Sequence, residues 1–312
     1  GRCRNEKRAI KKNWDDTQKN LVMELSILGE REKGTSRLEM AVSAYRAALD
    51  IRIRDLKVEV NLGNTLRALG QRESGTARLE EAVLVHREVV KTISPHQSRI
   101  NWATAQIALA NSLSCLGERE ESLERLEEAL SAYNAALEVF ERDQFPLDWA
   151  MIHNNLGNAL QVLSRREGGT RRLIEAEAAY LAALEEWTHD RVPLEWAKAQ
   201  KNLGDVLQLV GHGESGTQRL EEAQVAYNAA LKVYTRAQMP LDWAITQIAL
   251  SGLWSVSLTS RLETTWKPAL HILKVRKAAR VRLWRSFRNL AKPDTSKRAT
   301  RALNWFRIDK GR

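Results

Sequence analysis

The sequence has few cysteines, prolines and glycines, and it has no long apolar run. Its two cysteines, Cys3 and Cys115, provide neither a disulfide framework nor a cysteine-based metal site. Six prolines and 16 glycines exclude a collagen-like or linker-dominated chain. No apolar run approaches the roughly 18 residues that a membrane span needs. Residues 1–10, GRCRNEKRAI, contain no apolar signal segment and no initiator methionine, so we expect a fragment or a processed start.

The positive charge of the chain is concentrated at its two ends. Residues 13–254 contain 27 Lys and Arg against 35 Asp and Glu, whereas residues 255–312 contain 16 Lys and Arg against three Asp and Glu. With 43% hydrophobic and 28% charged residues, the chain is expected to fold in water. A mildly acidic body with basic ends differs from a uniformly basic nucleic-acid binder.

A segment of 47 residues repeats along the body of the chain. Tryptophan recurs at this interval, at Trp102, Trp149, Trp196 and Trp243, and the text around the last three reads PLDWA, PLEWA and PLDWA. We therefore divide the chain into a basic leader (1–13), a repeat region (14–258) and a basic tail (259–312). The repeat region contains five copies and a partial sixth, at 14–54, 55–101, 102–148, 149–195, 196–242 and 243–258.

Each copy is expected to form two helices. In the fourth copy, one apolar face contains Trp149, Ile152, Leu156, Leu160 and Leu163, and a second contains Leu173, Ala176, Tyr180, Leu184 and Trp187. A proline marks the start of the first helix, where a missing N–H costs little. The second helix is expected to be capped by the hydroxyl of Thr35, Thr76, Thr170 or Thr217. Stacked hairpins of this kind predict an all-α fold, an α-solenoid of helix-turn-helix repeats.

The strings NNLGNAL at 154–160 and EAEAAYLAALE at 175–185 resemble the tetratricopeptide repeat family. The resemblance rests on the Leu-Gly pair in the first helix and on the spacing of Ala176, Tyr180 and Ala183 in the second. It spans residues 14–254, although the family period is about 34 residues. The resemblance implies a right-handed superhelix whose first helices line a concave peptide-binding groove, and it implies no catalytic activity.

No motif indicates catalysis or a cofactor. GHGESG at 211–216 fits the pattern Gly-x-Gly-x-x-Gly, but a predicted helix precedes it, which favours a helix–helix turn. The six histidines do not pair at metal-ligand spacing. Glutamate pairs such as Glu127 and Glu128 recur at one repeat position, which is typical of a solvated helix face. The sequence therefore predicts no enzyme, no cofactor, no metal site and no small-molecule substrate.

Polar residues recur on the face of the first helices that, by the resemblance, lines the groove. Lys201 lies where carboxylate-binding members of the family carry a lysine, but Asp205 replaces the companion asparagine, so binding of a peptide C-terminus is not predicted. The predicted groove residues are Asn64, Arg67, Asn111, Asn154, Asn158, Gln161, Lys198, Lys201, Asp205 and Gln208.

Two roles are open for the recurrent asparagines. Their amides can hydrogen-bond the backbone of an extended ligand, or they can bond to the neighbouring repeat. A groove role predicts that Asn111→Ala with Asn158→Ala weakens partner binding and leaves the melting temperature almost unchanged. A structural role predicts that the same double variant unfolds.

The sequence thus predicts a cytoplasmic, non-catalytic scaffold that binds a protein or peptide partner in its groove. One alternative is a regulatory or sensor module of a larger effector protein. Another is binding to nucleic acid or to an anionic membrane through the basic tail, if the tail is genuine. That alternative rests on an apolar helical stripe among Lys and Arg residues, formed by Ile272, Val275, Ala279, Leu283, Phe287 and Leu290.

The tail also fits a shift of reading frame. The repeat is in register at Trp243 and Leu250 and is lost by Thr264. Read from the third base of each codon, residues 265–274 permit Leu-Glu-Ala-x-Ala-Ala-Tyr-Leu-Glu, which is close to residues 174–181. A shifted frame and a genuine basic tail both stay open, and the nucleotide sequence decides between them.

Overall fold

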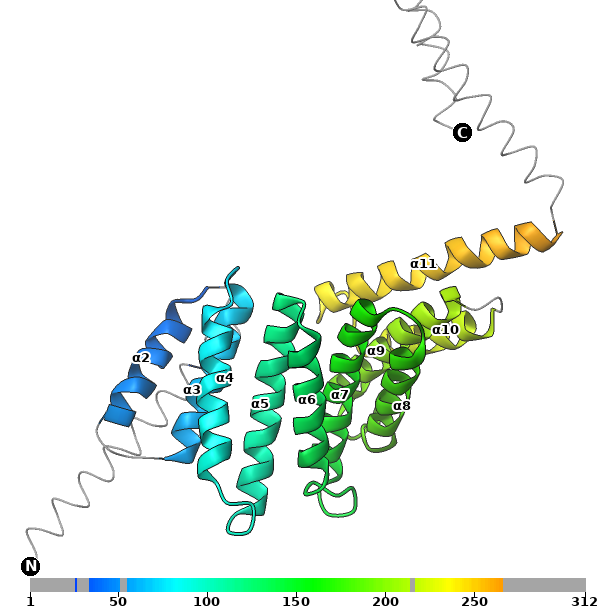
Figure 1. Ribbon diagram of the computed structural model, residues 1–312. Helices are drawn as coiled ribbons and strands as arrows, with labels where there is room; N and C mark the ends of the chain where they lie inside the picture. The colour runs from blue at the N-terminus through cyan, green and yellow to red at the C-terminus, as the bar shows by residue number, and fades with distance from the viewer. Residues whose placement is uncertain (1–25, 27–33, 51–54, 214–216, 266–312) are drawn as a thin grey trace, which may run out of the picture. The chain divides into compact units, whose positions relative to one another are not determined.

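The computed structural model describes residues 26, 34–50, 55–213 and 217–265, and all regular structure in this part of the chain is α-helical. The helices are α2 (Ser36–Asp50), α3 (Leu56–Arg72), α4 (Ala77–Thr92), α5 (Arg99–Glu120), α6 (Leu123–Leu137), α7 (Pro146–Glu167), α8 (Arg171–Glu186), α9 (Pro193–Gly213), α10 (Gln218–Ala230) and α11 (Pro240–Thr265). They appear in Figure 1 under these labels.

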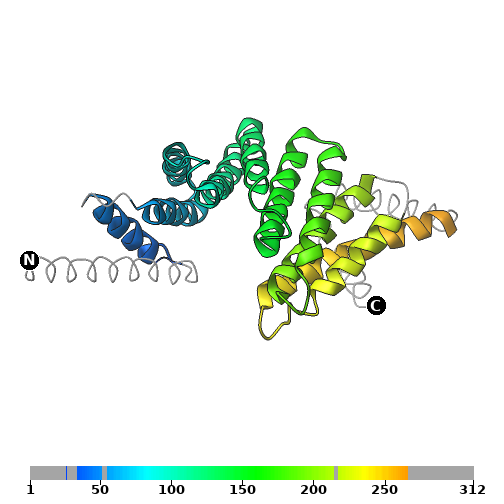
Figure 2. The same cartoon turned by 90° about the horizontal axis from the view of Figure 1, so that it is seen from below.

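The helices pack as hairpins that follow one another along the chain. In the second to fifth copies the first helix contacts the second, as in α3 with α4 and α7 with α8. The second helix then packs on the first helix of the next copy, as α4 does on α5 and α8 on α9. Successive first helices also contact one another, α3 with α5, α5 with α7 and α7 with α9, and the colours in Figure 2 follow these helices in chain order. These contacts between neighbours confirm the predicted all-α solenoid of helical repeats.

The prolines begin the first helices as the sequence predicts. Pro146, Pro193 and Pro240 are the first residues of α7, α9 and α11. Proline has no N–H, and the first N–H groups of a helix have no partner within it, so no hydrogen bond is lost there. The loop that precedes each of these first helices therefore ends at its proline.

The threonines precede the second helices as predicted, but the predicted capping bond is wrong. No hydroxyl of Thr76, Thr170 or Thr217 accepts from a backbone N–H, because the backbone of each threonine is already helical rather than extended. The Thr76 hydroxyl lies 2.6 Å from Glu80 Oε1 instead, four residues along the helix. A helical φ and ψ at the cap turns the side chain away from the first free N–H groups.

The turn between α7 and α8 uses left-handed backbone. Gly168 and Gly169 follow α7 with φ values of +73° and +78°, a region that glycine enters without strain. The GHGESG string belongs to the same kind of connection, because α9 continues to Gly213 and α10 begins at Gln218. Residues 214–216 lie outside the described residues.

One aromatic position of the second helix organises the inside of each copy. It contains Tyr45, His86, Tyr133, Tyr180 and Tyr227, all of them buried. The ring lies against the glycine of the Leu-Gly pair, since a Cβ atom added at Gly157 would lie 2.7 Å from Tyr180 Cε1. The recurrent Leu-Gly pair of the first helix therefore has a steric reason, which is the close approach of an aromatic ring.

The position of Leu156 differs from the prediction. Ile152 and Leu163 in α7 are fully buried, whereas Leu156 is only half-buried. Helical spacing places all three on one face, but it does not specify how completely the facing helices cover each side chain. The core of the fourth copy therefore depends on Ile152 more than on Leu156.

The recurrent glutamates are partly exposed, as predicted, and they also link neighbouring copies. Glu128 accepts from Arg87 of the preceding copy at 2.6 Å, and Glu127 pairs with Arg172 of the next copy. Ion pairs at this exposure usually contribute about 0–1 kcal/mol. They favour the register of adjacent second helices more than they add to stability.

The chain divides into two units, Gly1–Leu250 and Ser251–Arg312. The helices α2 to α10 belong to the first unit. In the second unit the structure describes residues 251–265, which form the end of α11. Of the predicted basic tail (259–312), residues 259–265 belong to the end of α11, and the rest of the tail, with the stripe that begins at Ile272, lies outside the described residues. The frame-shift hypothesis stays a prediction.

Candidate functional site

The predicted groove residues all lie on first helices. Asn64 and Arg67 belong to α3, Asn111 to α5, three residues to α7 and four to α9. Most of them are half-buried, Lys198 is exposed, and Asn154 and Gln161 are buried. The set is therefore a partly covered polar surface rather than a row of free side chains.

Four of these residues accept a hydrogen bond of 2.9 Å or shorter from the aromatic position of their own copy. The Tyr133 hydroxyl donates to Asn111 Oδ1 at 2.6 Å, and the Tyr180 hydroxyl donates to Asn158 Oδ1 at 2.8 Å. The Tyr227 hydroxyl has the corresponding bond to Asp205 Oδ1 at 2.9 Å and a second to Gln208 Oε1 at 2.8 Å. The recurrent Asn or Asp thus provides a hydrogen-bond acceptor for the hydroxyl of a buried tyrosine. Burial raises the pKa of Tyr180 well above its usual 10.

Further amide bonds connect adjacent copies. Asn155 Nδ2 donates to Asn111 Oδ1 at 3.2 Å, and Asn202 Nδ2 donates to Asn158 Oδ1 at 3.0 Å. Asn202 also reaches Asn154 Oδ1 at 3.4 Å. Of the two roles that the sequence leaves open for the asparagines, bonding to the neighbouring repeat is the one for which the structure contains contacts. Their role toward a ligand stays a prediction.

These bonds change the expected effect of replacing Asn158. We expect Asn158→Ala to lower the free energy of unfolding by about 1–3 kcal/mol, because it removes the nearer acceptor of both the Tyr180 hydroxyl and the Asn202 amide and leaves each with one longer bond. Asn228→Ala in α10 is the matched control, since that residue is exposed and gains the same helix propensity. Urea denaturation of both variants measures the difference. Equal midpoints would show that the Asn158 bonds do not contribute to stability.

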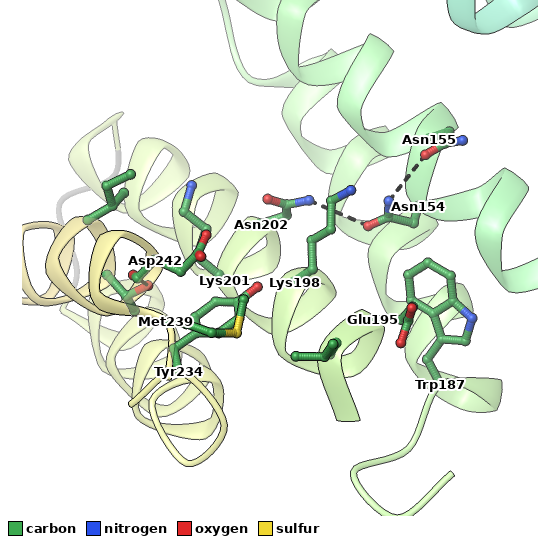
Figure 3. A pocket seen from close by; sticks show the side chains of 13 residues that line it. Asn154, Asn155, Trp187, Glu195, Lys198, Lys201, Asn202, Tyr234, Met239 and Asp242 are labelled. Atoms are coloured by element: carbon green, nitrogen blue, oxygen red, sulfur yellow. Dashed lines mark hydrogen bonds between the residues drawn. The ribbon is translucent and has the colours of Figure 1, made fainter. Parts of the chain in front are cut away.

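A pocket of about 510 Å³ lies where the fourth, fifth and sixth first helices meet. Asn154 and Asn155 of α7, Lys198 of α9 and Ile245 of α11 line it. Figure 3 labels the first three of these residues. The remaining lining residues are Trp187, Leu194, Glu195, Lys201, Asn202, Tyr234, Met239, Asp242 and Thr246. Three predicted groove residues, Asn154, Lys198 and Lys201, are therefore brought together, and the other seven do not line this pocket.

Sequence reasoning missed the apolar and aromatic part of this pocket. Trp187 and Tyr234 are one period apart, at the position that holds Ile93 and Phe140 in earlier copies. Leu194 follows the proline of its copy, as Leu147 and Leu241 do, and these leucines are exposed. The sequence does contain a signal for these leucines. An aliphatic residue recurs at the start of each of these helices, at a position outside the apolar face that packs in the core.

The charges of the pocket are partly paired. Lys201 Nζ lies 2.6 Å from Asp205 Oδ2, so this cation is neutralised within α9. Lys198 is exposed and makes no ion pair with any described residue. Burial and the carboxylates of Asp242 and Glu195 together raise the pKa of Tyr234 to about 12. The pocket thus offers amides, one unpaired ammonium group and two carboxylates beside aromatic rings.

Two structural findings concern the wider classes of function. None of the described helices is both long enough and apolar enough to cross a membrane. Among the same residues, no group of three or more His, Cys, Asp and Glu is placed to hold a metal ion.

Comparison with known proteins agrees with the repeat architecture. Residues 60–96 and 102–143, which cover most of α3–α4 and α5–α6, match the model of the tetratricopeptide repeat. A thermophilic TPR protein of Thermus thermophilus has a similar fold, with a TM-score of 0.52 and 19% identity over 75% of this chain and 99% of that chain. BtubC from P. vanneervenii gives a TM-score of 0.47 with 19% identity, over 78% of this chain and 90% of that chain. No curated protein matches this chain in sequence. Two successive copies of this chain thus match the tetratricopeptide repeat, and the chain has a fold similar to that of a solved TPR protein.

Proposed function

We propose that this protein is a non-catalytic scaffold that binds a segment of a partner protein on the face formed by its first helices. Repeats of this family generally mediate protein–protein interaction, and their fold is typically a scaffold rather than an enzyme. The observation that carries the proposal is the pocket of about 510 Å³, because it is lined by first helices of three successive copies. A ligand that fills the pocket contacts three successive repeats. An extended polypeptide chain makes contacts of this kind, whereas a small substrate can bind within one repeat.

The chemistry of the pocket suits a polypeptide. Asn154 and Asn202 line it with amides whose NH2 groups bond to neighbouring asparagines. The Asn202 carbonyl oxygen accepts no bond from any described residue, so it can accept from an N–H group of a peptide backbone. Leu194 and Ile245 add exposed aliphatic surface for side chains of the ligand. Pockets that combine apolar walls with a few convergent polar groups are the usual form of binding sites.

Exposed aliphatic residues extend this surface beyond the pocket. They occupy the first turn of each first helix, one period apart, at Ile100, Leu147, Leu194 and Leu241. A single exposed leucine needs no explanation, but repetition in four copies forms a row. We propose that a bound segment lies across successive first helices along this row and the polar residues next to it.

The test selects ligands from a library of random dodecapeptides displayed against the full-length protein. We expect the selected peptides to lose binding by on the order of 10-fold or more in Leu194→Ser with Lys198→Ala, because both side chains line the pocket. Leu181→Ser with Lys91→Ala is the matched control on second helices, since Leu181 is 47% exposed and Leu194 is 51% exposed. Circular dichroism establishes that both variants remain folded.

Comparison of the two variants shows whether the selected peptides bind in the pocket or on another surface. Peptides that respond only to the pocket variant support the proposal. Peptides that bind both variants as they bind the parent protein, or a library that yields no binder, would overturn it.

A further inference from the structure

The pocket carries its charges in two regions of α9 and α11. Glu195 and Asp242 occupy the same repeat position in the first turns of these helices, one period apart. Lys198 and Lys201 lie further along α9 (Figure 3). Since Lys201 is paired with Asp205, the two carboxylates outnumber the unpaired ammonium groups that line the pocket.

Tyr234 brings a hydroxyl to this pocket at a position that is apolar in the preceding copies. The equivalent residues are Ile93, Phe140 and Trp187. Tyr234 is only 5% exposed, it lines the pocket, and its hydroxyl makes no hydrogen bond to any described residue. A buried side chain that presents an unused polar group to a cavity is suited to bond a ligand there.

The carboxylates near Tyr234 are also unused by other side chains. Neither Glu195 nor Asp242 forms an ion pair within the described part of the chain. Burial is the main cause of the raised pKa of Tyr234, and the charges of Asp242 and then Glu195 raise it further, so both carboxylates add negative potential at the hydroxyl. A carboxylate in the first turn favours its own helix, but Asp148 of α7 has that role without lining the pocket.

The walls around the hydroxyl are apolar. Met239 packs in the same apolar cluster as Tyr234, and Leu194 also lines the pocket. Long basic side chains bury their methylene stems on such surfaces while the charged end meets polar groups. An aromatic face adds attraction for a cation that lies over it.

We propose that this part of the pocket binds a lysine or arginine side chain of the partner segment, with Tyr234 as hydrogen-bond acceptor and with Glu195 and Asp242 as counter-charges. The proposal rests on the proposed function, because it concerns the same pocket, and it adds a sequence preference. Lys198, which makes no ion pair with any described residue, is left to bind carbonyl or acidic groups of the segment. The partner is then a mixed-charge segment with a basic anchor residue.

The experiment uses the dodecapeptide library on the full-length protein and on three variants. We expect the parent protein to enrich Lys or Arg at one peptide position. That preference should weaken by about 10-fold in Glu195→Gln with Asp242→Asn, since charge-assisted bonds are lost. Tyr234→Phe should weaken it by a smaller factor, because the ring remains. Asp148→Asn is the matched control, since it removes a first-turn carboxylate that does not line the pocket, and it should leave the preference unchanged.

Each outcome decides between the two proposals. Pocket-dependent peptides with no basic preference, or with an acidic one, overturn this inference and leave the proposed function standing. A basic preference that survives in Glu195→Gln with Asp242→Asn also overturns it. A library that yields no pocket-dependent binder overturns both. Melting temperatures of the variants confirm that a lost preference does not come from unfolding.

Discussion

Acidification from neutral pH to about pH 4 should lower the free energy of unfolding of this protein by about 3 kcal/mol through His86 alone. His86 is fully buried, and burial lowers its pKa from the usual 6.5 to about 4. Between these two pKa values, His86 is therefore protonated in the unfolded chain and neutral in the folded chain. The contribution to stability is fully present above pH 6.5 and is lost as the pH falls from 6.5 towards 4.

The hydrogen bonds of His86 explain why the neutral form is held. Its Nε2 lies 3.2 Å from the carbonyl oxygen of Val60, which can only accept, and its Nδ1 lies 3.0 Å from the Ser112 hydroxyl. Nε2 is therefore the donor and Nδ1 the acceptor of the neutral ring. A second proton on Nδ1 would reverse the direction of the bond with Ser112 and place a charge inside the solenoid, where burial and then Arg67 oppose it.

The chain contains its own control for this pH effect. His86→Tyr with Ser112→Ala places at this site the pair found one period later, where Tyr133 of the third copy is buried and Ala159 of the fourth copy occupies the position of Ser112. Gly63 and Asn64 are already present to receive the ring and the hydroxyl. Urea denaturation at several pH values compares the two proteins. Equal losses of stability between pH 6.5 and 4 would assign the effect to other groups.

Ile152→Ala should lower the free energy of unfolding by about 2–5 kcal/mol. Ile152 is fully buried in α7, and truncation removes apolar contacts and leaves a cavity that the packed helices do not fill. In a solenoid the coupling is local, so the loss should be greatest in the fourth copy and its neighbours. Hydrogen exchange of α7 and α8 measures where the protein opens.

Leu156→Ala is the matched comparison within the same helix. Leu156 is half-buried, so we expect a smaller loss of roughly 1–2 kcal/mol. Both variants replace an aliphatic side chain of the same size by alanine, so only their burial differs. A larger effect at Leu156 than at Ile152 would contradict the packing described above.

The sequence by itself determined the repeat and therefore the architecture. The 47-residue interval of the tryptophans and the 3.6-residue period of the apolar residues specify helical hairpins that must stack to bury their faces. The prolines at the helix starts were predictable for the same reason, since their effect on the backbone is local. Three pocket residues, Asn154, Lys198 and Lys201, were also within reach, because the resemblance places them on the first-helix face.

Only the tertiary structure decided which of these residues have partners. Asn111 and Asn158 look identical to groove residues in sequence, but each accepts a bond from a tyrosine that lies 22 residues further along the chain. The lining of the pocket by Trp187, Glu195, Tyr234 and Asp242 depends on how adjacent copies meet, and no local pattern specifies that meeting. Periodicity identifies the face of a helix on which a side chain lies. Whether that side chain is covered, bonded or open to a ligand is set by contacts between copies.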